Sequence, residues 1–255
     1  LIFVSLLDFH KEIKGYTQDR QPGIEADMNP KPIAELDEYK AAGKLQGKVA
    51  LITGGDSGIG RSVAILYAKE GANVAIDYYD EHQDAEDTVR RLEELGVKAK
   101  AYAHDLKDEK QSKQLIDNVV KDFGGLNILV NNGGVQFPRD NFEDITPDQV
   151  KETFMTNIFG MMFLSQAAVP HLSEGDAIIN TTSVTAYRGS GHLIDYSATK
   201  GAIVSFTRSL ATTLMEKSIR VNAVAPGPIY TPLIPSTFDE EKVENQGGDT
   251  PMGRR

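Results

Sequence analysis

Short apolar runs alternate with helical patterns between Lys48 and Ala225, and this alternation constrains the fold more than any other feature of the sequence. The strand-like runs are rich in β-branched residues and lie at 49–53, 74–76, 99–103, 128–130, 177–180 and 220–225. The helical patterns lie near 61–70, 84–95, 107–123, 147–172 and 196–217. Strands separated by helices form βαβ units, which build a parallel sheet with helices on both faces. We therefore predict an α/β fold with a doubly wound parallel sheet.

The N-terminal part of the chain departs from this pattern. Residues 1–44 are predicted to form an irregular arm, because prolines and a glycine at 22, 23, 30 and 32 interrupt any regular period. Residues 45–255 are predicted to form the domain. The apolar run at 1–7 is too short to span a bilayer. We interpret it as a fragment end or upstream read-through, with a weak membrane-surface segment as the alternative.

Charge and composition exclude several classes of function. The chain has 27 basic and 37 acidic residues, a formal net charge of −10, and an acidic chain repels a nucleic-acid backbone. It has no cysteine, which excludes disulfides and thiolate zinc sites, and its histidines are scattered. No apolar run approaches the roughly 20 residues that span a bilayer. We predict a cytoplasmic protein with no nucleic-acid partner, no membrane span and no metal.

A glycine-rich turn follows the first apolar run and opens the first helix. It reads TGGDSGIG over 53–60, with glycines at 54, 58 and 60. Glycine lets the backbone approach a pyrophosphate, which then lies at the positive end of the helix. A tight turn that binds nothing is the alternative for a lone glycine triplet. The position of this turn after the first strand of a βαβ series favours dinucleotide binding.

A tyrosine, a lysine and a serine are candidate catalytic residues. Tyr196 and Lys200 are four residues apart, so they share one face of a predicted helix. A tyrosine that acts as a base at pH 7 faces a cost of roughly 4 kcal/mol, which a neighbouring ammonium lowers. Ser183 follows an apolar strand, at the edge where doubly wound sheets bind ligands. In isolation the pair also fits a snorkelling lysine beside a partly buried tyrosine.

Together these features resemble the short-chain dehydrogenase/reductase family over about Leu45 to Arg255. Further matches are NNGG over 131–134, Asn157, and PGPIYT over 226–231, while Gly133 departs mildly from the alanine usual in the family. QPGIE over 21–25 and INTTSVTAY over 179–187 are similar to a bacterial and plant branch of aldehyde reductases and glucose/ribitol dehydrogenase-like proteins. The resemblance implies a Rossmann fold. It also implies hydride transfer between NAD or NADP and a small carbonyl or alcohol substrate, namely an aldehyde, ketone or polyol.

The resemblance assigns four catalytic residues. Tyr196 would be the general acid in reduction and the general base in oxidation. Lys200 would lower the pKa of Tyr196 and hold the nicotinamide ribose, and Ser183 would polarise the substrate carbonyl. Asn157 would help to relay protons through a water to the lysine. The implied cofactor-binding residues are Gly54, Asp56, Ser57, Gly58, Ile59, Gly60, Tyr78, Asp105, Leu106, Asn132, Gly133, Tyr196, Lys200, Pro226, Gly227, Ile229 and Thr231.

The choice between NAD and NADP stays open. Tyr78 stands where NAD-preferring relatives carry an acid, so the direct acid clamp is missing. Ser57 stands where many NADP-preferring relatives carry a basic residue. The acidic neighbours Asp77, Asp80 and Glu81 would repel a 2′-phosphate.

The resemblance also implies that something follows this chain. Family members usually continue with a helix and a seventh strand, so we predict that the chain lacks both, is truncated, and leaves its sixth strand as an exposed edge. The long helices at 147–172 and 196–217 are predicted to form a homo-oligomer interface.

Two other function classes remain as alternatives. A catalytically silent dinucleotide-binding sensor or scaffold could share this fold, although the intact serine, tyrosine and lysine argue against it. Sugar-nucleotide epimerases usually have a tighter glycine turn and a longer C-terminal substrate domain, and neither is present.

Overall fold

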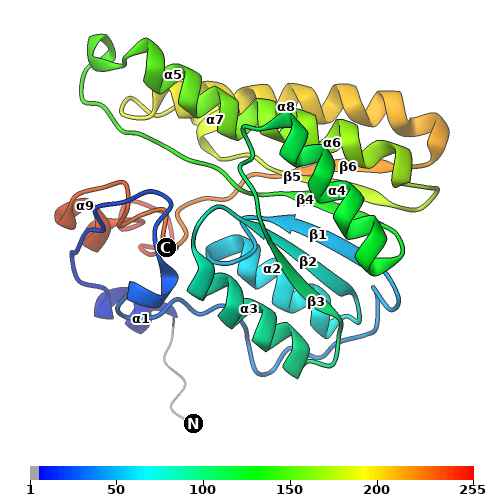
Figure 1. The fold of residues 1–255 in the computed structure, drawn as a ribbon. Helices are drawn as coiled ribbons and strands as arrows, with labels where there is room; N and C mark the ends of the chain where they lie inside the picture. Colours follow the sequence, from blue (N-terminus) through cyan, green and yellow to red (C-terminus); the bar gives the residue numbers. More distant parts are fainter. Residues whose placement is uncertain (1–5) are drawn as a thin grey trace.

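Six parallel strands form one sheet at the centre of the molecule (Figure 1). The computed structural model describes residues 6–255. The strands are β1 (Val49–Thr53), β2 (Asn73–Tyr78), β3 (Ala99–Ala103), β4 (Ile128–Asn131), β5 (Ala177–Thr181) and β6 (Arg220–Val224). Their spatial order is β3-β2-β1-β4-β5-β6, so the winding reverses between β1 and β4. In such sheets, ligands bind outside the carboxyl ends of the strands at this reversal.

Helices cover both faces of the sheet (Figure 1). One face carries α2 (Gly58–Lys69) and α3 (His82–Glu94). The other carries α4 (Glu109–Phe123), α6 (Gly160–Ala168) and α8 (Ile194–Leu214). This is the doubly wound Rossmann architecture that the sequence predicted.

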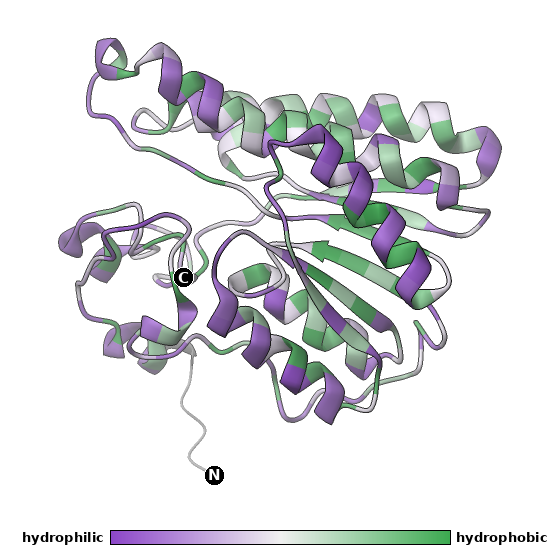
Figure 2. Ribbon diagram, in the orientation of Figure 1, coloured by the Kyte–Doolittle hydropathy of each residue, from purple (hydrophilic) through white to green (hydrophobic). Residues whose placement is uncertain are grey.

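The first strand shows how the sheet supplies both halves of the core. Alternate side chains of a strand point to opposite faces. Ala50 and Ile52 pack in one apolar cluster with α2 and α3, whereas Val49 and Leu51 pack in the other cluster with α4 and α6. All of β1 is buried, as expected for a strand covered on both faces. In Figure 2 the central strands are mostly hydrophobic, and α3 and α4 alternate between hydrophobic and hydrophilic positions.

Truncating a side chain of this core is expected to destabilise the fold strongly. Leu129 on β4 is fully buried, so Leu129→Ala should lower the free energy of unfolding by about 2–5 kcal/mol. Leu36→Ala is the matched control, because Leu36 is 61% exposed and its change should stay within about 0.5 kcal/mol. Urea unfolding of both variants measures the difference. Equal effects of the two substitutions would contradict the assignment of Leu129 to the core.

The helix predicted at 147–172 is continuous but not uniform, which corrects the expectation of one regular helix. It consists of α5 (Pro147–Phe154), a π-helical turn (Met155–Phe159), α6 and a final 3₁₀ turn (Val169–His171). The π-helical turn contains Asn157, which lies inside the molecule at 1% exposure. Such turns are frequent at functional sites, since the extra residue re-aims a side chain.

Three short helices were not predicted from the sequence: α1 (Leu6–Glu12), α7 (Thr185–Arg188) and α9 (Glu240–Asn245). The arm predicted to be irregular therefore contains a helix, α1, and also a 3₁₀ turn at Glu25–Asp27. The arm contacts the C-terminal part of the chain, as Ile13 and Met28 pack in a small buried cluster with Tyr230. Figure 1 shows α1 and α9 on the same side of the molecule.

The last strand lies at the edge of the described sheet. In the part of the chain that the structure covers, β6 pairs with β5 alone, and Val224 is 57% exposed. No helix among residues 6–255 combines the length and apolarity needed to cross a bilayer.

Candidate active site

A cleft of about 1610 Å³ runs along the carboxyl ends of the strands. Ligand pockets usually measure about 300–1,000 Å³, so this cleft has room for a dinucleotide and a substrate together. Almost every predicted cofactor residue lines it, from the glycine turn through Tyr78, Asp105 and Asn132 to Thr231. Of the predicted site residues, Gly60 and Asn157 do not line it, because they lie behind its wall.

The glycine turn forms the start of α2 and is closely packed. Gly54 and Gly58 have φ values of +58° and +52°, which favour glycine. A Cβ atom on Gly60 would lie 1.8 Å from the carbonyl oxygen of Gly54. Ser57 precedes the helix, and its side chain makes no capping hydrogen bond. The Gly58 N–H already donates to Glu25 of the arm at 2.7 Å. A pyrophosphate at this end of the helix would therefore meet the N–H groups of Ile59 and Gly60.

The catalytic candidates meet at the middle of the cleft. Ser183 follows β5, while Tyr196 and Lys200 lie one turn apart on α8. Ser183 Oγ accepts hydrogen bonds from the N–H and hydroxyl of Thr185, both at 3.1 Å, which leaves its own O–H free to donate. Lys200 Nζ donates to the carbonyl oxygen of Thr181 at 2.9 Å and lies 5.3 Å from the centre of the Tyr196 ring.

Burial sets the protonation of this pair. It raises the pKa of Tyr196 to about 12, although a hydrogen bond with Ser183 acts in the opposite direction. Burial also lowers the pKa of Lys200 to about 8. Burial is thus the main influence on the pKa of Tyr196, and the role predicted for Lys200 stays a prediction. A tyrosine with so high a pKa keeps its proton at neutral pH.

Asn157 holds the backbone beside these residues. Its Oδ1 accepts a hydrogen bond from Val135 N–H, and its Nδ2 donates to Val135 O, both at 2.8 Å. Nδ2 also lies 3.2 Å from the hydroxyl of Thr199 on α8. A Cβ atom on Gly134 would lie 3.1 Å from Asn157 Oδ1 and 3.7 Å from Lys200 Nζ, so the glycine separates the two side chains.

The floor of the cofactor groove is tied to the glycine turn. Asn132 Nδ2 donates to Thr53 O at 3.1 Å, and the backbone N–H groups of Asn132 and Gly133 donate to Thr53 Oγ1 at 2.9 Å. A Cβ atom on Gly133 would lie 2.8 Å from Leu106 Cδ1, so alanine here requires that side chain to move. Since this atom is the end of a flexible side chain, packing alone does not require the glycine at this position.

Acidic side chains at the end of β2 are held by protein groups, which weakens the predicted repulsion of a 2′-phosphate. Asp77 is 1% exposed and bonds to His104 Nδ1 at 3.0 Å, and burial raises the pKa of Asp77 to about 6. Asp80 is paired with Arg20 of the arm. Glu81 accepts from the backbone N–H groups of residues 79 and 80 at 3.1 and 2.9 Å. The structure therefore leaves the choice between NAD and NADP open.

Asp56, a predicted cofactor-binding residue, lines the cleft but is only 4% exposed. Burial raises the pKa of its carboxyl group to about 8. Asp56 therefore offers a neutral carboxyl group at pH 7.

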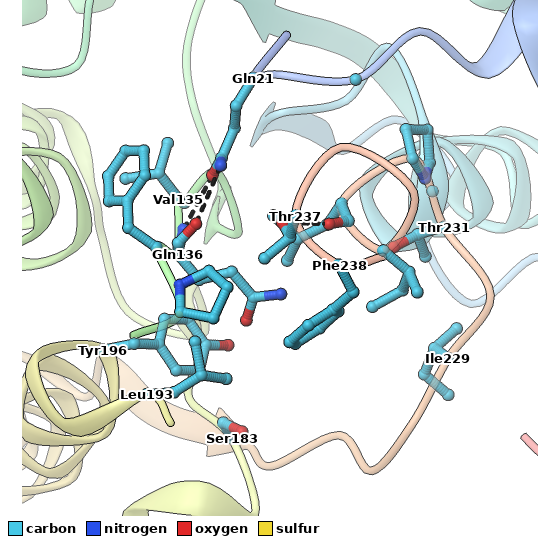
Figure 3. Close-up of a pocket in the computed structure, with 18 of the residues that line it drawn as sticks. Gln21, Val135, Gln136, Ser183, Leu193, Tyr196, Ile229, Thr231, Thr237 and Phe238 are labelled. Carbon is cyan, nitrogen blue, oxygen red and sulfur yellow. Dashed lines mark hydrogen bonds between the residues drawn. The ribbon is translucent and has the colours of Figure 1, made fainter. Parts of the chain in front are cut away.

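Several residues of the cleft were not among the predicted site residues. Gln21 and Gly23 come from the arm, Gln136 follows β4, and Phe238 belongs to the segment after β6 (Figure 3). Arg188 and His192, on the segment between Ser183 and Tyr196, also line the cleft. Of these residues, only Gln21 and Gly23 belong to a motif that the sequence analysis identified, QPG over 21–23.

Comparison with known proteins agrees with this geometry. The family model described as short chain dehydrogenase matches residues 48–242. The chain belongs to the short-chain dehydrogenase family. Family membership and the cofactors of its relatives make it an NAD(P)-dependent oxidoreductase of carbonyl and alcohol groups.

Relatives within the short-chain dehydrogenase family include two named plant enzymes. The chain is 50% identical to a glucose and ribitol dehydrogenase of Daucus carota and 48% identical to the chloroplastic NADPH-dependent aldehyde reductase 1 of Arabidopsis thaliana. Each match covers 93% of this chain and 84% of the relative. A solved short-chain dehydrogenase of Burkholderia cenocepacia in complex with NADP has a TM-score of 0.74 and 37% identity, over 78% of this chain and 81% of the other.

Proposed function

We propose that the protein reduces small aldehydes or related carbonyl compounds, with Tyr196 as the proton donor. The observation that carries this proposal is the position of Tyr196 in the cleft, buried and close to Ser183, with a pKa raised to about 12. Such a hydroxyl is protonated at neutral pH, so it suits the acid of a reduction better than the base of an oxidation. The names of the two plant relatives fit carbonyl and polyol substrates.

In this proposal Ser183 and Tyr196 act on the substrate carbonyl directly, while Lys200 and Asn157 support them. The hydroxyls of Ser183 and Tyr196 donate hydrogen bonds to the substrate oxygen, where negative charge develops. When bound, a reduced nicotinamide cofactor would provide the hydride for the carbonyl carbon. Tyr196 then transfers its proton to the oxygen, and the charge of Lys200 stabilises the phenolate that remains. Asn157 fixes the backbone beside Lys200 through Val135.

The backbone N–H groups of Ile59 and Gly60 at the start of α2, next to the Gly58 N–H that Glu25 holds, would bind the cofactor pyrophosphate. The nicotinamide half of the cofactor would lie against a second group of cleft residues, namely Asn132, Gly133, Pro226, Gly227, Ile229 and Thr231. The end of β2 and the Asp105–Leu106 segment would line the adenosine half.

Reduction is expected to slow as the pH rises through about 8. Lys200, whose pKa is about 8, is charged below that pH and neutral above it, while Tyr196 stays protonated throughout. Because the ammonium stabilises the forming phenolate, kcat/KM should be flat below pH 8 and fall above it. A pH profile of aldehyde reduction measures this. A rise across the same range would contradict the assigned role of Lys200.

The proposed function is tested by following nicotinamide absorbance with NADH or NADPH and a panel of small aldehydes and sugars. Aldehyde-dependent loss of the reduced cofactor supports the proposal and shows which cofactor is preferred. Tight cofactor binding with no turnover on any carbonyl substrate would instead favour the silent sensor or scaffold.

We also propose a homo-oligomer that forms through the helices at 147–172 and 196–217. Val150, Phe159 and Met162 support this, since these apolar side chains are 37–43% exposed on the first of these helical segments. A monomer mass measured in solution by light scattering would contradict the homo-oligomer. The cytoplasmic location stays a prediction.

A further inference from the structure

The N-terminal arm reaches the substrate end of the cleft through Gln21. The Gln21 side-chain amide bonds to both backbone polar groups of Gln136 (Figure 3). Gln21 Nε2 donates to Gln136 O at 2.9 Å, and Gln136 N–H donates to Gln21 Oε1 at 2.8 Å. A residue of the arm thus fixes the peptide of a residue 115 positions away.

The arm itself is held against the elements that border the cleft. Gln18 N–H donates to Pro235 O at 2.7 Å, which ties the arm to the segment after β6. Gly23 packs so closely on this segment that a Cβ atom would lie 2.5 Å from Pro232 O. Glu25 accepts from Gly58 N–H at 2.7 Å and from Arg61 at 2.8 Å, at the start of α2. Gln21 is therefore held in place on both sides.

The side chain of Gln136 is buried yet has no protein partner. Gln136 is 4% exposed and lines the cleft. Among residues 6–255, the bonds of Gln136 are those of its backbone to Gln21, and none involves its side-chain amide. Figure 3 shows Gln136 beside Tyr196, with Phe238 across the pocket. Because this amide lines the cleft without a protein partner, its donors and its acceptor are available to a ligand group.

Its neighbours indicate the chemistry of that group. Leu193 and Phe238 line the same part of the cleft and offer no polar atoms. A carboxamide is neutral and carries both donors and an acceptor. A hydroxyl group, which can donate and accept, is the matching partner.

We propose that Gln136 is a specificity residue that hydrogen-bonds a substrate hydroxyl next to the reacting carbonyl. Gln21 is the positioning residue that holds it. The site then prefers hydroxylated aldehydes to plain aldehydes of the same length. This inference rests on the proposed function and adds the substrate class.

The test compares glyceraldehyde with propanal, which has the same carbon chain without the hydroxyls. The wild-type enzyme is expected to favour glyceraldehyde in kcat/KM. Gln136→Leu should lower the ratio of the two kcat/KM values by about 10–100-fold, since the amide bonds the hydroxylated substrate alone. Gln21→Ala should lower the same ratio by a smaller factor, through loss of positioning. Gln136→Met is the second variant if leucine prevents folding.

Gln114→Leu is the matched control, because Gln114 lies on the surface of α4 and bonds to Asn118. It should leave the ratio unchanged. Two results for Gln136→Leu would overturn the inference while the proposed function stands. One is an unchanged ratio, and the other is an equal loss of kcat/KM on both aldehydes. Turnover of neither aldehyde by the wild-type enzyme would overturn both.

Discussion

Tyr196→Phe is expected to lower kcat for carbonyl reduction by about 10²–10⁴-fold, the usual contribution of a general acid. The substitution removes one hydroxyl from a residue that is 9% exposed and lines the cleft with Ser183. The ring stays in place, so the cofactor should bind with nearly unchanged affinity. Steady-state kinetics with the preferred nicotinamide cofactor and an aldehyde, combined with a fluorescence titration of the cofactor, separates the two effects.

Tyr187→Phe is the matched control, since Tyr187 is 67% exposed and its substitution should leave kcat unchanged. A loss below about 10-fold in Tyr196→Phe would show that another group supplies the proton. Parallel losses of turnover and cofactor binding would indicate a role in binding rather than in proton transfer.

Gly60→Ala is expected to weaken cofactor binding by about 10–100-fold. The corresponding loss of binding free energy is typical of an extra methyl group in a closely packed site. The added Cβ atom would lie 1.8 Å from Gly54 O and 2.8 Å from Asn132 Nδ2. Since Gly54 O belongs to the backbone of the turn, the turn must move. Isothermal titration with the reduced cofactor measures the change in Kd.

Gly125→Ala is the control for this substitution. A Cβ atom on Gly125 would meet nothing within 4 Å, and Gly125 lies away from the cleft. Its Kd should match that of the wild-type enzyme. Unchanged binding in Gly60→Ala would contradict the assignment of the turn to the cofactor.

The central strands β1, β2 and β4 could be predicted because they are buried on both faces. Such strands are continuous apolar runs, as in VALIT at β1, and their limits are marked by glycine or polar residues. The short helices α1, α7 and α9 were missed, because four to seven residues are too few to show a helical period. Helices of this length depend on tertiary contacts.

The catalytic residues of the cleft could be predicted from the sequence, whereas Gln136, on its substrate side, could not. Ser183, Tyr196 and Lys200 are found from the sequence because their chemistry requires fixed spacing and known strand ends. Gln136 belongs to no such pattern. Its importance follows from a contact with Gln21, which depends on where the arm crosses the domain.

Electrostatics was the weakest part of the sequence prediction. Charge counting near β2 suggested repulsion of a phosphate, yet Asp77 is buried against His104. Burial also raises the pKa of Tyr196, an influence that the Lys200 spacing does not indicate. Both outcomes depend on desolvation, which the order of residues does not reveal.

Direct hydride transfer to a substrate carbonyl is the central claim. The reduced cofactor, deuterated at the transferable position of its nicotinamide ring, is incubated with the wild-type enzyme and glyceraldehyde, and the alcohol product is examined by mass spectrometry and NMR. We predict one deuterium per product molecule, on the carbon that was the carbonyl carbon. Product without deuterium at that carbon, or deuterated cofactor that is never consumed, would contradict the account.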